Sequence, residues 1–193
     1  MSPLRPMLPM LMIAAALSLG GGSPAAAQSA DPALLQAEQA AMASLAWMDG
    51  TWRGEAVTNS PGGAHRVTQT ERIGPLLGGT IKLLEGKAFN ADGSSGFNAF
   101  GVVSYDPASK RYTLHSYAQG RAGDFALTLT ATGYVWEIPL GAMTIRYTAT
   151  LKDGVWNEVG DRVMPGQPPQ RFFEMNLRRV GDSAWPGAGG EQR

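Results

Sequence analysis

The sequence predicts an all-β protein, an antiparallel up-and-down β-barrel of about ten strands with one N-terminal helix. Three observations support this fold class. After Gly50 the spacing of apolar residues changes from a helical period of about 3.6 to a strand period of about 2. Glycine supplies 25 of the 193 residues, and much of it stands in short turns between the expected strands. No helical segment separates those strands, which argues against a parallel α/β sheet.

Residues 1–27 match a secretory signal peptide. Arg5 is the only early charge, an apolar run covers residues 7–19, and the alanine triplet 25–27 supplies the small residues that a signal peptidase recognises. A membrane anchor is the alternative, but the apolar run is shorter than the roughly 20 residues that a span needs. We therefore expect cleavage before Gln28 and an exported, soluble protein in the periplasm or outside the cell.

A helix is predicted over residues 32–47. Asp31 stands at the N-cap position and Pro32 in the first turn, where each residue type is favoured. Apolar residues recur at helical spacing and form a single stripe, which needs a surface to pack against. They are Leu34, Leu35, Met42 and Leu45. We expect this helix to stop at Asp49-Gly50 and to plug one end of the barrel.

Short runs rich in β-branched and aromatic residues follow, separated by turns that contain glycine or proline. The expected strands cover residues 51–58, 65–73, 79–89, 97–105, 111–118, 124–131, 134–138, 143–151, 155–163 and 171–180. An antiparallel meander that closes into a barrel leaves no free strand edge, and a β-sandwich is the runner-up. Residues 28–180 are therefore expected to form one domain, and the glycine-rich stretch 181–193 a disordered tail.

Charge and cysteine content exclude several classes of function. The chain has 16 basic and 16 acidic residues, and the loss of Arg5 with the signal peptide leaves 15 − 16 = −1. A balanced chain carries no electrostatic footprint for nucleic acid. The absence of cysteine excludes disulfides, thiolate metal sites, thiol nucleophiles and lipid attachment at cysteine.

The segment Gly50-Thr51-Trp52 opens the first expected strand directly after the helix, and this G-x-W resembles the calycin superfamily, which includes lipocalins and fatty-acid-binding proteins. Most of residues 45–180 resembles a bacterial calycin-like (lipocalin-like) domain family of unknown function. The matching stretches are Gly50-Thr51-Trp52, Gly78-Gly79-Thr80, Ser104-Tyr105-Asp106-Pro107, Arg111-Tyr112, Asp153-Gly154-Val155-Trp156-Asn157-Glu158 and Phe172-Phe173-Glu174-Met175. The resemblance implies a β-barrel with a central cavity and Trp52 at its closed end, and it implies no reaction.

A related branch, the nitrobindin-like haem barrels, also begins with G-x-W-x-G and holds its iron with a histidine near the C-terminus. The stretch from Phe172 to Val180 contains no histidine. We therefore expect no cofactor, and a haem-binding barrel remains the alternative.

His115 and Tyr117 are candidates for contacts with a ligand. Strand alternation places both on the same face as Thr113, and either face of this strand is free to line the cavity. His115 has the chemistry of an iron ligand or an acid–base group. The simpler interpretation is a half-exposed strand histidine with a hydrogen-bond partner.

Arg146 and Glu158 are the charged candidates. Arg146 shares one face of its strand with three threonines, and the opposite face carries an apolar row from Met143 to Leu151. The usual alternation puts the apolar row inside, whereas barrels that bind acidic lipids turn an arginine inward to pair with the ligand carboxylate. Glu158 lies on the next strand, so a buried Arg146–Glu158 ion pair is possible, either around a ligand or as a purely structural salt bridge.

These observations favour an exported binding protein for a small hydrophobic or amphipathic ligand held in a β-barrel cavity. The candidate ligand-binding residues are Trp52, His115, Tyr117, Arg146 and Glu158. A haem barrel and a structural envelope protein with a filled barrel are the alternatives. No residue set indicates catalysis, no metal site is expected, and the oligomeric state stays open.

Overall fold

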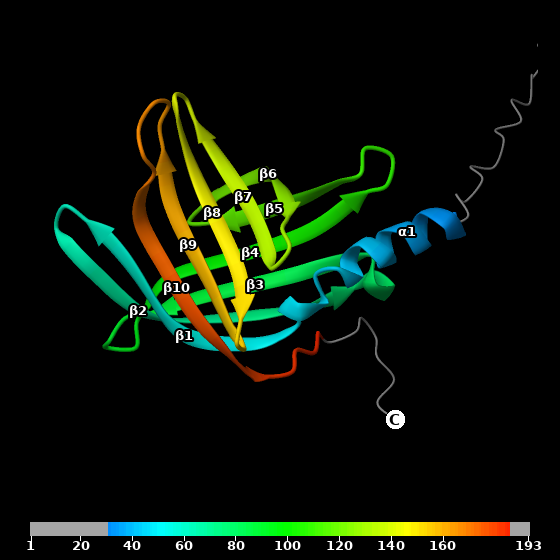
Figure 1. Cartoon of the computed structure of the whole chain (residues 1–193). Coiled ribbons are helices and arrows are strands. Elements are labelled where there is room, and N and C mark those ends of the chain that lie inside the picture. The colour runs from blue at the N-terminus through cyan, green and yellow to red at the C-terminus, as the bar shows by residue number, and fades with distance from the viewer. Residues whose placement is uncertain (1–30, 186–193) are drawn as a thin grey trace, which may run out of the picture. The chain divides into compact units, whose positions relative to one another are not determined.

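A computed structural model describes residues 31–185 and shows a closed barrel of ten antiparallel strands (Figure 1). The strands are β1 (Gly50–Ser60), β2 (Gly63–Leu76), β3 (Ile81–Phe89), β4 (Ser95–Asp106), β5 (Arg111–Ala118), β6 (Arg121–Leu129), β7 (Gly133–Leu140), β8 (Met143–Lys152), β9 (Val155–Val163) and β10 (Gln170–Gly181). Each strand pairs with its neighbours in sequence, and β10 pairs with β1 to close the barrel. The predicted fold class is thus confirmed, while the predicted signal peptide lies outside the described residues.

The N-terminal helix is shorter than the sequence predicts. Helix α1 (Pro32–Ala43) starts with the Asp31 carboxylate accepting the Ala33 N–H at 2.9 Å. The expected helix over 32–47 is then interrupted at Ser44, and a short 3-10 helix, η1 (Ala46–Met48), follows. The break turns the chain into the end of the barrel, where Leu45 and Met48 are fully buried. No helix among residues 31–185 is long and apolar enough to cross a membrane.

A tight turn connects β2 to β3 through a second short 3-10 helix, η2 (Leu77–Gly79). Gly78 and Gly79 adopt φ values of 67° and 89°, a left-handed backbone that glycine adopts without steric cost. The Gln39 side chain of α1 donates to the Gly78 carbonyl at 2.9 Å. This contact ties the helix to the closed end of the barrel.

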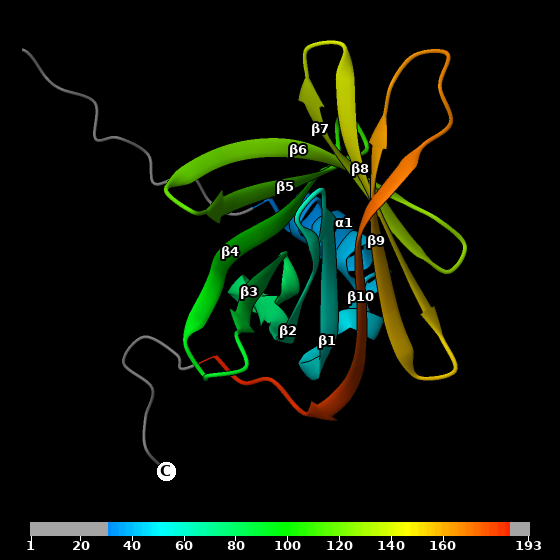
Figure 2. The same cartoon turned by 90° about the vertical axis from the view of Figure 1, so that its left-hand side faces the viewer.

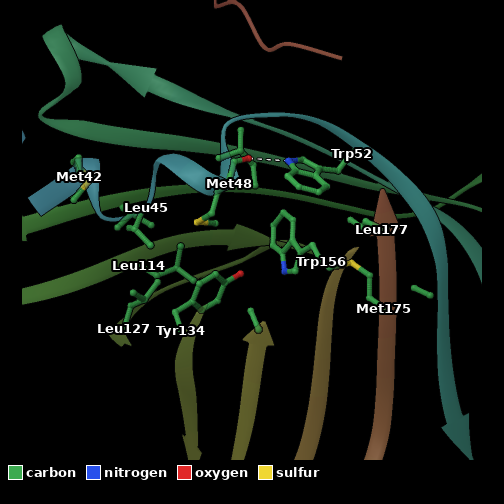
Figure 3. Packing of buried hydrophobic residues seen from close by; sticks show 14 residues of the cluster. Met42, Leu45, Met48, Trp52, Leu114, Leu127, Tyr134, Trp156, Met175 and Leu177 are labelled. Carbon is green, nitrogen blue, oxygen red and sulfur yellow. Dashed lines mark hydrogen bonds between the residues drawn. The ribbon is translucent and has the colours of Figure 1, made fainter. Parts of the chain in front are cut away.

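The closed end is built from large apolar side chains (Figure 3). Trp52 is 2% exposed and donates its indole N–H to the Met48 carbonyl at 2.8 Å. The Trp52 and Trp156 rings meet edge to face with centroids 5.6 Å apart, and Trp47 meets Trp156 at the same separation. Dense aromatic packing of this kind excludes water, so this end of the barrel is a conventional core.

Strand β8 follows the alternation that its sequence predicts. Ile145 and Ala149 are buried and face the interior, while Arg146 and the threonines lie on the outer face. Tyr147 lies on the inward face of β8 and pairs with Trp136 on β7 and Gly160 on β9. These two residues therefore face the interior as well.

Strands β6 and β7 pair over a shorter stretch than any other neighbouring strands. Only Leu127 to Leu129 of β6 meets Tyr134 to Trp136 of β7. Beyond this contact the β5–β6 hairpin turns away from β7 (Figure 2). The barrel wall is therefore weakest along this seam, at the end away from α1.

The chain after β10 stays in contact with the barrel. The Ser183 hydroxyl donates to the Ile73 carbonyl, and the Arg72 guanidinium lies 3.8 Å from the centroid of the Trp185 ring. Residues 182–185 thus lie along β2, within the region for which the sequence predicts a disordered tail. The remainder of that stretch, 186–193, lies outside the described residues.

Candidate functional site

Two carboxyl groups face the interior of the barrel. Glu158 on β9 pairs with the buried residues Ala149 and Met175, and it is itself 8% exposed. Glu71 on β2 pairs with the buried residues Trp52 and Gly86. Alternation along each strand therefore turns both carboxyl groups inward, next to the tryptophans of the closed end, since Glu71 pairs with Trp52 and Glu158 follows Trp156 by two residues on β9.

Glu158 is held by two donors from β7. The Tyr134 hydroxyl donates to its Oε2 at 2.8 Å, and the Trp136 indole N–H donates to its Oε1 at 3.4 Å. Burial raises the pKa of the Glu158 carboxyl, and the Tyr134 hydroxyl together with the indole N–H groups of Trp136 and Trp156 only partly offset this effect. Burial, together with the nearby charge of Glu158, also raises the pKa of the Tyr134 hydroxyl well above its usual value, so Tyr134 remains a donor.

Glu71 is enclosed at its carboxyl, although the residue as a whole is half-buried. Gln69 donates to its Oε1 at 2.6 Å. A Cβ atom at Gly86 would lie 2.8 Å from the same oxygen, so the glycine provides the space that the carboxyl fills. Burial raises the pKa of Glu71 from 4.5 to about 8; the Gln69 hydrogen bond opposes this shift, and the charges of Glu158 and Glu85 add to it. At neutral pH, Glu71 is therefore mostly protonated.

One polar atom of this layer has no partner. The Trp156 indole N–H is buried and donates to no acceptor at hydrogen-bond distance among the described residues. Figure 3 shows its nitrogen on the side of the ring that faces the Tyr134 hydroxyl. A buried donor without a partner costs about 1–3 kcal/mol, so its presence beside two carboxyl groups calls for a physical explanation.

The inner carboxyl groups have no cationic partner in the described part of the chain. None of its salt bridges includes Glu71 or Glu158. Lys82 is 2% exposed and pairs with Asp49 at the closed end. The Arg162 guanidinium lies 4.5 Å from the centroid of the Phe172 ring, farther along β9. Two acids therefore share one interior layer without a compensating charge.

Aromatic rings line the barrel next to these acids. Trp136 and Tyr147 stack with centroids 4.5 Å apart, Phe125 lies 5.5 Å from Trp136, and Phe173 lies 6.0 Å from Tyr147. All four side chains are only partly buried although they face inward, so this layer is less tightly filled than the closed end. A Cβ atom at Gly160 would lie 3.0 Å from Tyr147, which shows that the ring rests on this glycine.

The structure divides the five predicted site residues between the two faces of the wall. Trp52 and Glu158 face the interior, whereas His115, Tyr117 and Arg146 lie on the outer face. The considered Arg146–Glu158 ion pair does not form, because the two residues have opposite phases on paired strands. Ligand binding by each of the five stays a prediction.

Arg146 instead pairs with its outer-face neighbour on β7. Its Nε lies 2.6 Å from Glu137 Oε1, and the side chains are 43% and 42% exposed. Exposed pairs of this kind contribute little to stability.

His115 lies in a chain of hydrogen bonds across three strands. Its Nε2 lies 3.0 Å from Ser104 Oγ on β4, and its Nδ1 lies 2.8 Å from Asp124 Oδ1 on β6. This order of partners is that of a serine-hydrolase triad, but the Asp124 side chain is 71% exposed and Ser104 lies in the middle of paired strands. The network matches the simpler interpretation of a half-exposed histidine with hydrogen-bond partners.

An interior haem held by histidine does not fit these positions. His115 faces outward with both ring nitrogens engaged, and His65 is exposed on the β1–β2 hairpin, paired with Thr58. Within residues 31–185, no group of three or more His, Cys, Asp or Glu side chains is arranged to hold a metal ion.

The surface formed by the described residues carries a recess of about 530 Å³ over β3 to β6 and a smaller one of about 360 Å³ beside Trp47 at the closed end. The larger recess is bordered by Glu85, Lys87, Phe100, Tyr117 and Arg121. Tyr117 is 55% exposed there, so its position at this recess is separate from the interior site.

Sequence reasoning missed Glu71, Gln69 and Tyr134. Glu71 and Gln69 share a face with Ile73, and that alternation was the available signal. It was weak because the opposite face, with Thr68, Thr70 and Arg72, is equally polar.

Comparisons with known proteins support the fold. No protein-family model matches the sequence, and no curated protein matches it. Among solved structures, the chain is similar to the crystal structure of Rv2717c from M. tuberculosis, with a TM-score of 0.54 and 13% sequence identity over 72% of this chain and 97% of that chain. The protein therefore belongs to the class of closed antiparallel β-barrels, which is the fold that the calycin resemblance implies. Membership of the calycin-like family stays a prediction.

Proposed function

We propose that the protein binds a small amphipathic molecule inside its barrel. One observation carries the proposal: among the described residues, the interior holds two carboxyl groups without a cationic partner and an indole N–H without a hydrogen-bond acceptor. In this arrangement the aromatic layer takes the apolar part of the ligand, and Glu158 with Tyr134 takes its polar end.

The two interior acids are costly for a barrel that has only to be stable. A barrel selected only for stability gains by placing apolar side chains at Glu71 and Glu158, because buried acids without a counter-charge are costly. Retention of both acids beside partly exposed aromatic rings is therefore better explained by a bound molecule. Each CH₂ group that the ligand buries contributes about 0.8 kcal/mol, which offsets the cost of ordering the complex.

The β6–β7 seam supplies a route to this site. Trp136 and Phe125 border the seam at the point where strand pairing ends, and both rings belong to the aromatic layer. A ligand that passes between these strands breaks no other strand pairing. We also propose export to the periplasm or beyond, for which the N-terminal mass of the natural protein, starting at Gln28, is the test.

Native mass spectrometry of the protein purified from its own host tests binding directly. The expected result is an adduct that mild collisional activation removes. Titration with the apolar dye N-phenyl-1-naphthylamine, followed by energy transfer from tryptophan, provides a second measurement. Glu158→Gln should change the affinity for the dye. Glu137→Gln is the matched control, because Glu137 lies on the outer face of β7, and this variant should leave the affinity unchanged. An adduct-free spectrum together with no dye binding would leave the structural barrel as the better interpretation.

A further inference from the structure

We propose that the ligand's polar end is an organic cation, an amine or quaternary ammonium carried on an apolar body. This inference rests on the proposed function and names the chemical class of its ligand. It reverses the expectation, drawn from Arg146, of a ligand carboxylate.

The two inward acids are not paired with a basic side chain. Glu158 lies close enough to raise the pKa of Glu71, Lys82 pairs with Asp49, and the Arg162 guanidinium lies over the Phe172 ring. The remaining polar groups that face the acids are neutral. They are Gln69 on β2, Tyr134 and Trp136 on β7, Tyr147 on β8 and Trp156 on β9. A cation beside Glu158 therefore meets a favourable charge, and Glu71 adds a second when it ionises, while the charge of Arg162, which lowers the pKa of Tyr147, opposes the cation.

The Trp156 N–H is a buried donor with no acceptor at hydrogen-bond distance among the described residues. Buried donors of this kind are satisfied by an ordered water or by a group of a bound molecule. Trp156 is 2% exposed, and its N–H lowers the pKa of Glu158 without reaching the carboxyl at hydrogen-bond distance, so the donor points toward the group that the cation would contact. The orphaned donor and the uncompensated acids thus mark the same position.

Aromatic rings surround the two acids. Trp136 donates to Glu158 and stacks on Tyr147, so carboxylate and aromatic faces lie side by side. Cations are attracted to such faces, by about 0.5–2 kcal/mol when desolvated, and quaternary ammonium groups are recognised in cages of this composition. An anionic headgroup gains nothing from the same surface.

Cation binding should also displace a proton. At neutral pH, Glu71 is mostly protonated, since burial and the charges of Glu158 and Glu85 raise its pKa to about 8. A cation between the two carboxyl groups takes the place of that proton, and Glu71 ionises as the complex forms. Calorimetry in two buffers of different ionisation enthalpy measures this proton release.

Three probes with the same apolar chain test the headgroup. Isothermal titration calorimetry at pH 7 compares decyltrimethylammonium and decanoate, each below its critical micelle concentration, with decanol below its solubility limit. Decyltrimethylammonium is expected to bind at least about tenfold more tightly than decanoate, a difference of about 1.4 kcal/mol. In Glu158→Gln this preference should shrink to within about threefold, and in Glu137→Gln it should remain. Near-ultraviolet circular dichroism checks that each variant is folded, and Glu71→Gln serves as the second variant if Glu158→Gln is not.

The outcomes separate the two proposals. Tighter binding of decanoate, equal binding of the two charged probes, or an unchanged preference in both inner variants would overturn the cation inference while leaving the binding function standing. Failure of all three probes to bind would overturn the proposed function as well.

Discussion

The closed end of the barrel and the layer above it are built on the same strands but treat polar groups in opposite ways. At the closed end, the Trp52 N–H reaches the Met48 carbonyl, and the buried Lys82 ammonium reaches Asp49. Next to these groups, the Trp156 N–H has no hydrogen-bond acceptor and the two acids have no cationic partner among the described residues. The first layer satisfies its polar groups and stabilises the fold, and the second keeps groups that are costly in the free protein. The contrast separates the part that holds the barrel together from the part that a ligand completes.

The largest effect is expected at the closed end. Trp52→Ala removes a ring that is 2% exposed and packs against Trp156, so the free energy of unfolding should fall by about 3–5 kcal/mol. Urea denaturation measures the loss. Tyr117→Ala is the control, because that ring is 55% exposed and its removal should cost no more than about 0.5 kcal/mol. Similar losses in the two variants would contradict the assignment of this end as the stabilising core.

A second effect should appear at the buried ammonium. Asp49→Ala leaves the Lys82 charge in a site where its side chain is 2% exposed, and we expect a loss of about 3 kcal/mol. Lys82→Met removes the charge itself and should cost clearly less, because the apolar chain keeps its packing. Equal losses, measured by the same urea denaturation, would show that the ion pair stabilises the barrel by attraction rather than by avoiding an unpaired charge.

The raised pKa of Glu71 should make the free energy of unfolding depend on pH. Between pH 4.5 and about 8 the unfolded chain releases the Glu71 proton and the folded protein keeps it, so this contribution to stability is lost as the pH rises. The slope is at most about 1.4 kcal/mol per pH unit. Glu71→Gln removes this dependence, so the variant should gain stability over the natural protein at pH 8 and little at pH 5. Stability profiles that stay parallel would show that Glu71 is not held protonated.

A smaller effect is expected from the glycine that gives Glu71 its space. Gly86→Ala places a Cβ about 2.8 Å from the carboxyl, and the flexible end of Glu71 must move away. Unfolding free energy should fall by about 1 kcal/mol. The preference for decyltrimethylammonium over decanoate should weaken, because the cation loses one of its two acids. Gly160→Ala is the companion variant, since it presses on Tyr147 and Phe173 and should weaken all three decyl probes alike.

Much of the fold follows from the sequence because strand alternation and turn residues are local signals. The expected strand at 155–163 coincides with β9, and the unbroken alternation of apolar and polar residues on β8 favoured its apolar row as the inward one, with an inward Arg146 as the alternative. The helix expected to reach residue 47 ends at Ala43, because Leu45 and Met48 gain more from burial in the barrel end than from continued helix. Tertiary packing overrides local propensity at such a boundary.

The site was less accessible from the sequence, for a physical reason. Alternation assigns two faces to each strand, and only an apolar row says which face lies inside. His115 has the buried Leu114 as its neighbour, but Tyr112 and Ser116 make that row mixed, so its phase was undecided. Glu71 lies on a strand with polar residues on both faces. Its burial depends on pairing with β1 and β3, which no local pattern reveals.

The smallest effect is expected outside the barrel, at Arg146. Its ion pair with Glu137 is exposed by about two-fifths on each side, so Arg146→Met should change the unfolding free energy by no more than about 1 kcal/mol. The affinities for all three decyl probes should stay unchanged, because the guanidinium lies on the face of β8 opposite to Tyr147. A selective loss of decanoate binding in this variant would restore the arginine–carboxylate contact that the sequence suggested. Such a result would mean that β8 turns its other face to the ligand, and the division of the barrel into a stabilising end and an acidic binding layer would not hold.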